Sequence, residues 1–301
     1  MHWIFEPGFF QSHPVHVAFV VGTVVAVVSA VVGVFTVIRG QAFAGHSLAD
    51  VATAGGSGAV LISVNPLLGF VTGTVIGAGA MEMIGVRRAR GRDLATGIVL
   101  GASLGAAALF LYLSATSSNT TGASQSILFG SIFSTTPSTV PIVAACSALC
   151  LGIMSLISRP LLLGSVSTDL AAARGIPVRA VGLAYMLALS LAVGLSALAI
   201  GAILSTALLI GPPATAMRLT RRIGPATAVS CAIGVGAVWL GVLLAYDSYY
   251  WSSSPFPVSF FIVAVIFFGY LATELPFVRT AGARRRDLQG ETRPTGSPVS
   301  S

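Results

Sequence analysis

The sequence predicts an all-α protein, a polytopic bundle of transmembrane helices. Charged residues make up 8% of the 301 residues, about a third of the roughly 25% found in soluble domains. Hydrophobic residues make up 55%, and the mean hydropathy is +0.92. The chain also contains 34 glycines, which suit close packing of helices within lipid. So few charges do not cover a water-soluble surface, and we therefore expect an integral membrane protein.

Nine segments are apolar and come close to the roughly 20 residues that span a bilayer. They cover residues 16–38, 42–62, 67–85, 94–114, 141–156, 180–198, 200–217, 226–246 and 257–275. With nine spans, 15 of the 16 arginines fall in loops on one side of the membrane or at its edge. Basic loops remain in the cytoplasm, so we expect the N-terminus outside and the C-terminus inside. Residues 65–66, 116–126 and 247–254 then form outer loops.

We expect one transmembrane domain over residues 1–280, followed by a disordered cytoplasmic tail over residues 281–301. All basic residues are arginine and none is lysine. A Walker-type phosphate-binding loop needs a lysine, so the chain is not expected to hydrolyse ATP or to be an enzyme. The arginines form short clusters without interleaved aromatic residues, which argues against a nucleic-acid partner.

Two of the segments are expected to be interrupted helices. Residues 55–58 read GGSG within the second segment, and residues 211–213 read GPP near the end of the seventh. Broken helices at membrane depth often mark the substrate path of a transporter, although a packing kink is the alternative. Glycines four residues apart in the third and fourth segments indicate helix packing; they are Gly69, Gly73, Gly77, Gly97, Gly101 and Gly105.

His46 and Asp50 are the ionisable pair within a predicted span. They are four residues apart and therefore lie on the same face of a helix. An imidazole nitrogen and a carboxylate oxygen suit zinc, manganese or iron. Two ligands make an incomplete site, as transient passage of an ion requires. The alternative is a hydrogen-bonded pair that pins two helices together.

A short helix between two spans is predicted within residues 165–178, whose sequence is SVSTDLAAARGIPV. Its start can be capped by Ser167, Thr168 or Asp169, and Gly175 followed by Pro177 ends it. Small side chains on such a helix suit a groove in a partner protein. The alternative is an ordinary solvated loop.

Several motifs resemble the permeases of zinc, manganese and iron ABC importers, which are type II importers. The matching segments are residues 39–50 (RGQAFAGHSLAD), 92–98 (RDLATGI), 128–130 (LFG), 169–177 (DLAAARGIP) and 201–216 (GAILSTALLIGPPATA). The resemblance covers about residues 15–275. It implies that His46 and Asp50 hold the transported metal. It also implies an ATPase-coupling segment that contains Asp169, Leu170, Ala171, Ala172, Arg174 and Gly175.

The same resemblance implies a homodimer in the inner (plasma) membrane of a prokaryote, surrounded by lipid. Its partners would be a cytoplasmic ABC ATPase and an extracytoplasmic metal-binding protein, and no cofactor would be bound permanently. The chain departs from the family in two respects. The family usually has Asp at position 46 and His at position 50, and a Pro commonly precedes the Gly where this chain has TAG at residues 53–55. The reversal shifts the imidazole by about 6 Å along the helix.

Other functions remain open from the sequence. The same scaffold could carry a metal chelate, with His46 and Asp50 as a gate. A secondary transporter could use the pair as a proton relay. A structural or sensory membrane protein would transport nothing.

Overall fold

The computed structural model describes residues 12–85, 89–117, 121–130, 132–134, 136–202, 204–252 and 256–274. Every regular element in these ranges is helical, which confirms the predicted all-α class. The predicted tail, residues 281–301, lies outside the described residues. The helices are α1 (His13–Ile38), α2 (Ala42–Leu61), α3 (Pro66–Gly85), α4 (Ala89–Ser117), α5 (Thr121–Phe129), α6 (Val140–Val166), α7 (Thr168–Ala173), α8 (Val178–Ile200), α9 (Ser205–Leu219), α10 (Ile223–Ser252) and α11 (Val258–Ala272), with 3₁₀ turns η2 (Ile132–Ser134) and η3 (Pro137–Thr139).

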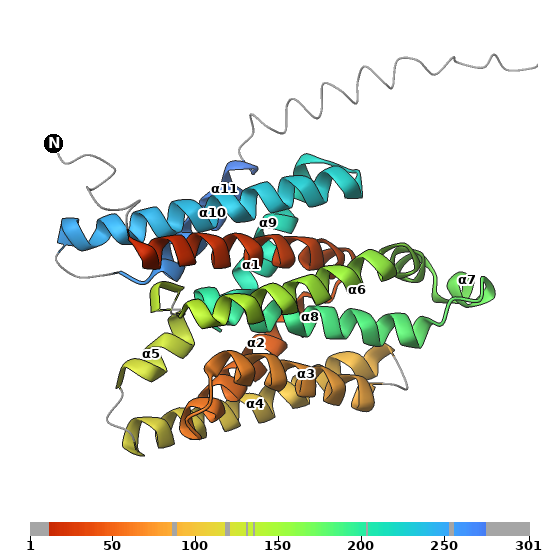
Figure 1. The fold of residues 1–301 in the computed structure, drawn as a ribbon. Helices are drawn as coiled ribbons and strands as arrows, with labels where there is room; N and C mark the ends of the chain where they lie inside the picture. The colour runs from red at the N-terminus through yellow and green to blue at the C-terminus, as the bar shows by residue number, and fades with distance from the viewer. Residues whose placement is uncertain are drawn as a thin grey trace, which may run out of the picture.

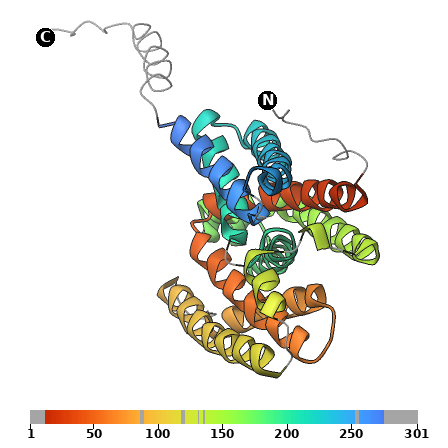
Figure 2. The same cartoon turned by 90° about the vertical axis from the view of Figure 1, so that its left-hand side faces the viewer.

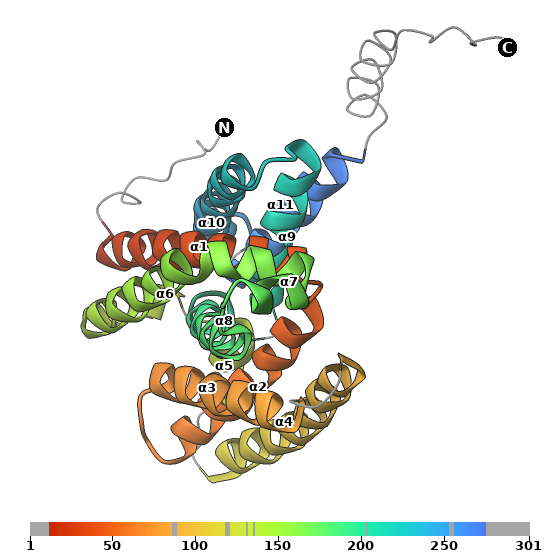
Figure 3. The ribbon, with the colours of Figure 1, turned by 90° about the vertical axis from the view of Figure 1, so that its right-hand side faces the viewer.

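The long helices run side by side along one axis, with α7 at one end of the bundle and α5 at the other (Figure 1). Figure 3 looks along this axis from the α7 end and shows α8 near the centre. Helices α1, α2, α3, α6 and α9 all pack against α8. Figure 2 looks from the opposite end, where α5 lies close to α2 and α8.

Six described helices are long and apolar enough to cross a membrane, which makes the chain a multi-pass membrane protein. These spans are His13–Ile38, Pro66–Met83, Leu94–Thr116, Pro137–Val166, Val178–Ile200 and Ile223–Ser248. The other three predicted segments also form helices, namely α2, α9 and α11. Of these, α9 and α11 have 15 residues each, and α2 carries His46, Asp50 and several Gly and Ser residues.

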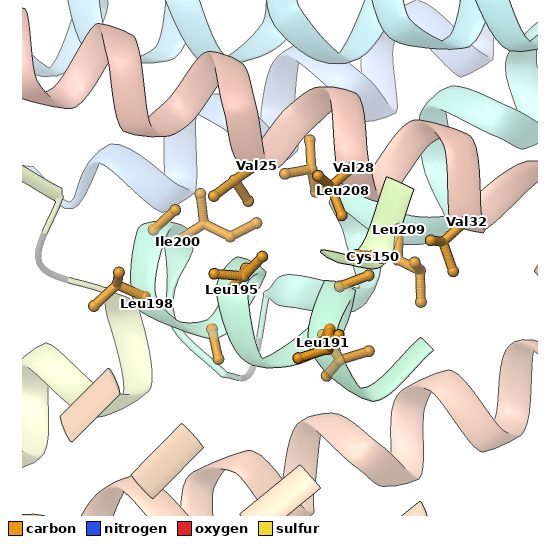
Figure 4. Packing of buried hydrophobic residues seen from close by; sticks show 14 of the residues in the cluster. Val25, Val28, Val32, Cys150, Leu191, Leu195, Leu198, Ile200, Leu208 and Leu209 are labelled. Atoms are coloured by element: carbon orange, nitrogen blue, oxygen red, sulfur yellow. The ribbon is translucent and has the colours of Figure 1, made fainter. Parts of the chain in front are cut away.

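The core lies where α1, α8 and α9 meet, and α6 adds Cys150 to it. Apolar side chains from these helices fill the space between the ribbons in Figure 4. The labelled residues are Val25, Val28, Val32, Cys150, Leu191, Leu195, Leu198, Ile200, Leu208 and Leu209. Because lipid is as apolar as these side chains, their contribution comes from close packing.

Polar side chains from neighbouring helices also hold α8. The hydroxyl oxygens of Ser29 on α1 and Ser196 on α8 are 2.7 Å apart. Thr74 on α3 donates a hydrogen bond to the backbone carbonyl of Ser190 at 3.0 Å. Such interhelical bonds contribute about 0.6 kcal/mol each within a membrane, and here they fix α8 against two different helices.

The expectation of an interrupted second segment is wrong, because α2 is one continuous helix through residues 55–58. Its glycines serve packing. A Cβ atom at Gly55 would collide with the backbone of Gly69, and one at Gly56 would collide with the ring of Phe70. Glycine therefore lets α2 approach α3 closely while both remain helical, so the packing alternative is the correct one.

The expectation that Gly211, Pro212 and Pro213 interrupt the seventh segment is also wrong, because α9 runs through them from Ser205 to Leu219. Pro213 cannot donate a hydrogen bond to the carbonyl of Leu209. That carbonyl lies against Gly33 of α1, where a Cβ atom would collide with it. The real break precedes α9, since α8 ends at Ile200 and α9 begins at Ser205.

Two further expectations need correction. Residues 116–126 were expected to form a loop, but α5 begins at Thr121, and its end supports the α8–α9 connection through a hydrogen bond from Ala202 N to Ile127 O at 3.2 Å. The glycines of α3 do pack against α2. Those of α4 do not, since no described atom lies within 4 Å of a Cβ added at Gly97, Gly101 or Gly105.

Candidate functional site

Helix α2 places His46 and Asp50 one turn apart on the same face. Their nearest side-chain atoms, His46 Nε2 and Asp50 Oδ2, are 4.0 Å apart, which is too far for a hydrogen bond. A tetrahedral ion with ligands at about 2.0–2.2 Å holds neighbouring ligand atoms about 3.4 Å apart. A side-chain adjustment of about 0.6 Å would therefore allow both atoms to reach one ion.

The imidazole of His46 faces away from the rest of the chain, whereas the carboxylate of Asp50 is largely covered. The His46 side chain is 52% exposed and that of Asp50 is 18% exposed. Within the described ranges no group of three or more His, Cys, Asp and Glu residues could hold a metal. The pair lies on a single helix and has no direct hydrogen bond, so it does not pin two helices together. One chain therefore presents an imidazole and a carboxylate on one face of α2, two groups of the kinds that bind transition metals.

Phe43 lies on the same face of α2, and the sequence interpretation missed it. It is three residues before His46 and seven before Asp50, a spacing that repeats on one helical face. The side chain is 47% exposed, although it is large and apolar. The spacing of Phe43 from the pair can be read from the sequence. Phenylalanine is common in apolar segments, however, so only the exposed face of α2 in the structure distinguishes this one.

The predicted short helix between two spans is present as α7. The Ser167 hydroxyl accepts a hydrogen bond from the backbone N–H of Leu170 at 3.2 Å and so caps the first turn. At the other end, Gly175 N donates to Ala172 O and Ile176 N donates to Ala171 O. This is a Schellman motif, and Gly175 has the positive φ of 74° that it needs. The capping prediction is confirmed in detail.

Most of the predicted coupling residues are exposed at the end of the bundle. Helix α7 stands out there beyond α6 and α8 (Figure 1). Ala171 is fully buried, whereas the remaining members of the predicted set are exposed: Asp169, Leu170, Ala172, Arg174 and Gly175. A buried alanine anchors the helix, and the other residues are accessible to a partner.

Two arginine contacts near helix ends were not predicted. The guanidinium carbon of Arg39 lies 5.0 Å from the centre of the Tyr185 ring, and Tyr185 donates a hydrogen bond to Thr36 at 2.9 Å. Arg218 at the end of α9 pairs with Glu274 and lies over the ring of Tyr270, 4.3 Å from its centre. These partners are more than 50 residues apart in sequence, so no local sequence pattern predicts the contacts.

Known proteins resemble this chain over most of its length. The chain is 29% identical over 226 residues to the manganese transport system membrane protein MntC of Halalkalibacterium halodurans, covering 74% of this chain and 76% of that protein. It is 28% identical over 204 residues to the high-affinity zinc uptake system membrane protein ZnuB of Haemophilus influenzae, covering 68% of this chain and 77% of that protein.

The fold also occurs in a solved structure. PsaBC from Streptococcus pneumoniae, determined in complex with Fab, superposes with a TM-score of 0.75 at 24% identity and covers 89% of this chain and 93% of that one. The family model described as the ABC 3 transport family matches residues 11–274. That match spans all of the described helices, and the chain therefore belongs to the ABC 3 transport family.

Proposed function

We propose that this chain is the permease subunit of an ABC importer that carries a divalent transition metal, manganese or zinc, across the membrane. The observation that carries the proposal is the exposed His46 and Asp50 pair on α2. An imidazole nitrogen and a carboxylate oxygen within 4.0 Å of each other suit such an ion. The names of the relatives, which refer to manganese and zinc, agree with this ligand chemistry.

A second copy of the chain would complete the metal site. One chain offers two ligands, and two copies related by a twofold axis would offer two imidazoles and two carboxylates. Four ligands of this kind match the tetrahedral coordination that zinc prefers, and added water would suit manganese. The outward orientation of His46 supports this arrangement, because its exposed face lacks cover from its own chain.

A separate cytoplasmic ATPase would drive transport by docking on α7. The capped helix presents Asp169, Leu170 and Arg174 beyond the bundle, and the chain lacks the lysine that phosphate binding would need. An extracytoplasmic binding protein would deliver the ion at the α5 end. Nucleotide binding would then shift the permease between outward-open and inward-open forms.

We further propose nine spans in a prokaryotic plasma membrane, formed by α1, α2, α3, α4, α6, α8, α9, α10 and α11. The N-terminus would lie outside and the C-terminus inside. The arginines at these helix ends support this arrangement, because the α1–α2, α7–α8 and α9–α10 connections carry Arg39, Arg174, Arg221 and Arg222, and Arg179 lies in the first turn of α8. Short or polar spans such as α2 and α9 are stable when other helices surround them.

Transport by the reconstituted complex tests the proposal. The permease and its ATPase are placed in liposomes, the metal-binding protein is added outside, and uptake of manganese, zinc and iron is measured with and without ATP inside. We expect ATP-dependent uptake that the double change His46→Ala and Asp50→Ala abolishes, while His13→Ala, a matched control at the start of α1, leaves it unchanged. Full uptake by the double variant would refute the assignment of the pair. Uptake of a metal chelate but not of the bare ion would refute the proposed substrate.

A further inference from the structure

The exposed face of α2 is asymmetric about the metal-binding pair. On the side of the N-terminus of the helix, the bulky Phe43 is three residues from His46, about 4.5 Å along the axis. On the other side, the next residues that α2 places on this face are Ala54, Ser57 and Gly58; Ala54 is half-buried, Ser57 is fully buried, and the ring of Phe110 on α4 lies beside Gly58. The next large side chain that α2 itself places on this face is Leu61 at the last turn, about 16 Å beyond Asp50.

This face cannot be turned to lipid. A carboxylate facing the hydrocarbon core costs about 2.5–3.5 kcal/mol even on the most lenient scale. Phe43 and Asp50 are seven residues apart, which at 3.6 residues per turn places them within about 20° of each other around the helix axis. Whatever Asp50 faces, whether protein or water, Phe43 therefore faces as well. The exposure of the ring, 47%, is then exposure to the ion path.

The bulky residue lies on the cytoplasmic side of the pair in the proposed topology. Helix α1 ends and α2 begins toward the end of the bundle that carries α7 (Figure 1). In Figure 3, which looks from that end, α2 lies between α9 and α4. An ion that arrives from outside would reach His46 and Asp50 first and would then meet Phe43.

We infer that Phe43 is the cytoplasmic gate of the metal path and closes the path on the cytoplasmic side of the His46 and Asp50 pair. This inference rests on the proposed function and on its homodimer, in which the rings from two copies would meet. An apolar constriction excludes water, and an ion cannot cross it while it keeps its hydration shell. The gate would therefore hold the ion at the pair until the ATPase separates the two copies of α2 at this end.

The passive leak of metal through the reconstituted complex tests whether Phe43 closes the path. Liposomes that contain a metal-sensitive dye are exposed to manganese without ATP. We expect Phe43→Ala to raise the leak by about tenfold or more, which corresponds to a barrier lowered by about 1.4 kcal/mol. Phe43→Leu keeps a bulky apolar group and should stay near the wild-type leak. Phe260→Ala, which removes an exposed ring from α11, is the matched control and should not leak.

A second measurement applies if Phe43→Ala fails to assemble. In a variant whose Cys146, Cys150 and Cys231 are replaced by alanine, Phe43→Cys should be crosslinked between two copies by a short bis-maleimide, because two rings that meet hold their Cα atoms farther apart than the roughly 7 Å that a disulfide spans. Absence of this crosslink, or an unchanged leak in an assembled Phe43→Ala complex, would overturn the inference. Both readouts work without ATP. If the wild-type complex showed no ATP-dependent uptake, the proposed function would be refuted. The leak measurement would still test whether Phe43 acts as the gate.

Discussion

Replacement of Gly130 by alanine should destabilise the bundle at the point where α5 meets the α8–α9 connection. Gly130 follows α5 and has a positive φ of 83°. A Cβ atom there would lie 2.6 Å from the backbone nitrogen of Gly201 and 2.8 Å from the carbonyl oxygen of Ala199. Both neighbours are backbone atoms, so no side-chain rotation relieves the collision. Two separate penalties therefore act at this one position.

The size of each penalty follows from the geometry. A side chain in the left-handed region costs about 1–2 kcal/mol. Restoring an ordinary contact of about 3.4 Å requires the backbones to separate by about 0.8 Å, and overpacking of this kind costs about 1–3 kcal/mol. Gly175 and Gly40 provide matched controls, since they have positive φ values of 74° and 65° but nothing within 4 Å of an added Cβ. Alanine at either control position bears only the first penalty.

Thermal unfolding of the purified protein in detergent separates the two penalties. We expect Gly130→Ala to unfold below Gly175→Ala and Gly40→Ala by about 2–12 °C, using about 2–4 °C per kcal/mol. The three variants would be compared at one detergent and protein concentration. Equal unfolding temperatures for all three would show that α5 does not press against the α8–α9 connection, and the reasoning from backbone contact would be wrong.

Two further predictions concern α7 and the topology. Ser167→Ala removes the acceptor for the N–H of Leu170, which should weaken α7 by about 1 kcal/mol and lower the affinity for the ATPase in a pull-down titration; an unchanged affinity would count against α7 as the docking helix. In a variant without its natural cysteines, a cysteine at Ser63 should react with an impermeant maleimide in intact cells, whereas one at Ser165 should react only after permeabilisation. The opposite pattern would exclude the proposed orientation.

The local features of the fold could be predicted from the sequence with good accuracy. The caps of α7 involve residues within nine positions of each other, from Ser167 to Ile176, so the pattern alone identifies them. The same holds for the shared face of His46 and Asp50, because the α-helical repeat places residues four apart on one side. Nine of the helices coincide with the nine apolar segments for the same reason.

The glycines and prolines show where local patterns mislead. The GGSG run at residues 55–58 has the composition of a break, yet α2 continues because Gly69 and Phe70 of α3 occupy the space that side chains would need. Pro213 leaves a carbonyl in α9 without a helical partner, and Gly33 of α1 makes room for it. In both cases the residue that decides the outcome belongs to another helix, so its effect is absent from the local sequence.

The sequence by itself determined that this protein lies in a membrane, that it is helical, and that its His46 and Asp50 share a helical face. These properties follow from composition and from the helical repeat, which are local. Only the tertiary structure decided which faces are covered. It buried α8 among five other helices, left the face of α2 with Phe43 uncovered, and placed α5 against the α8–α9 connection. Coverage depends on contacts between residues far apart in the chain, and no single segment encodes them.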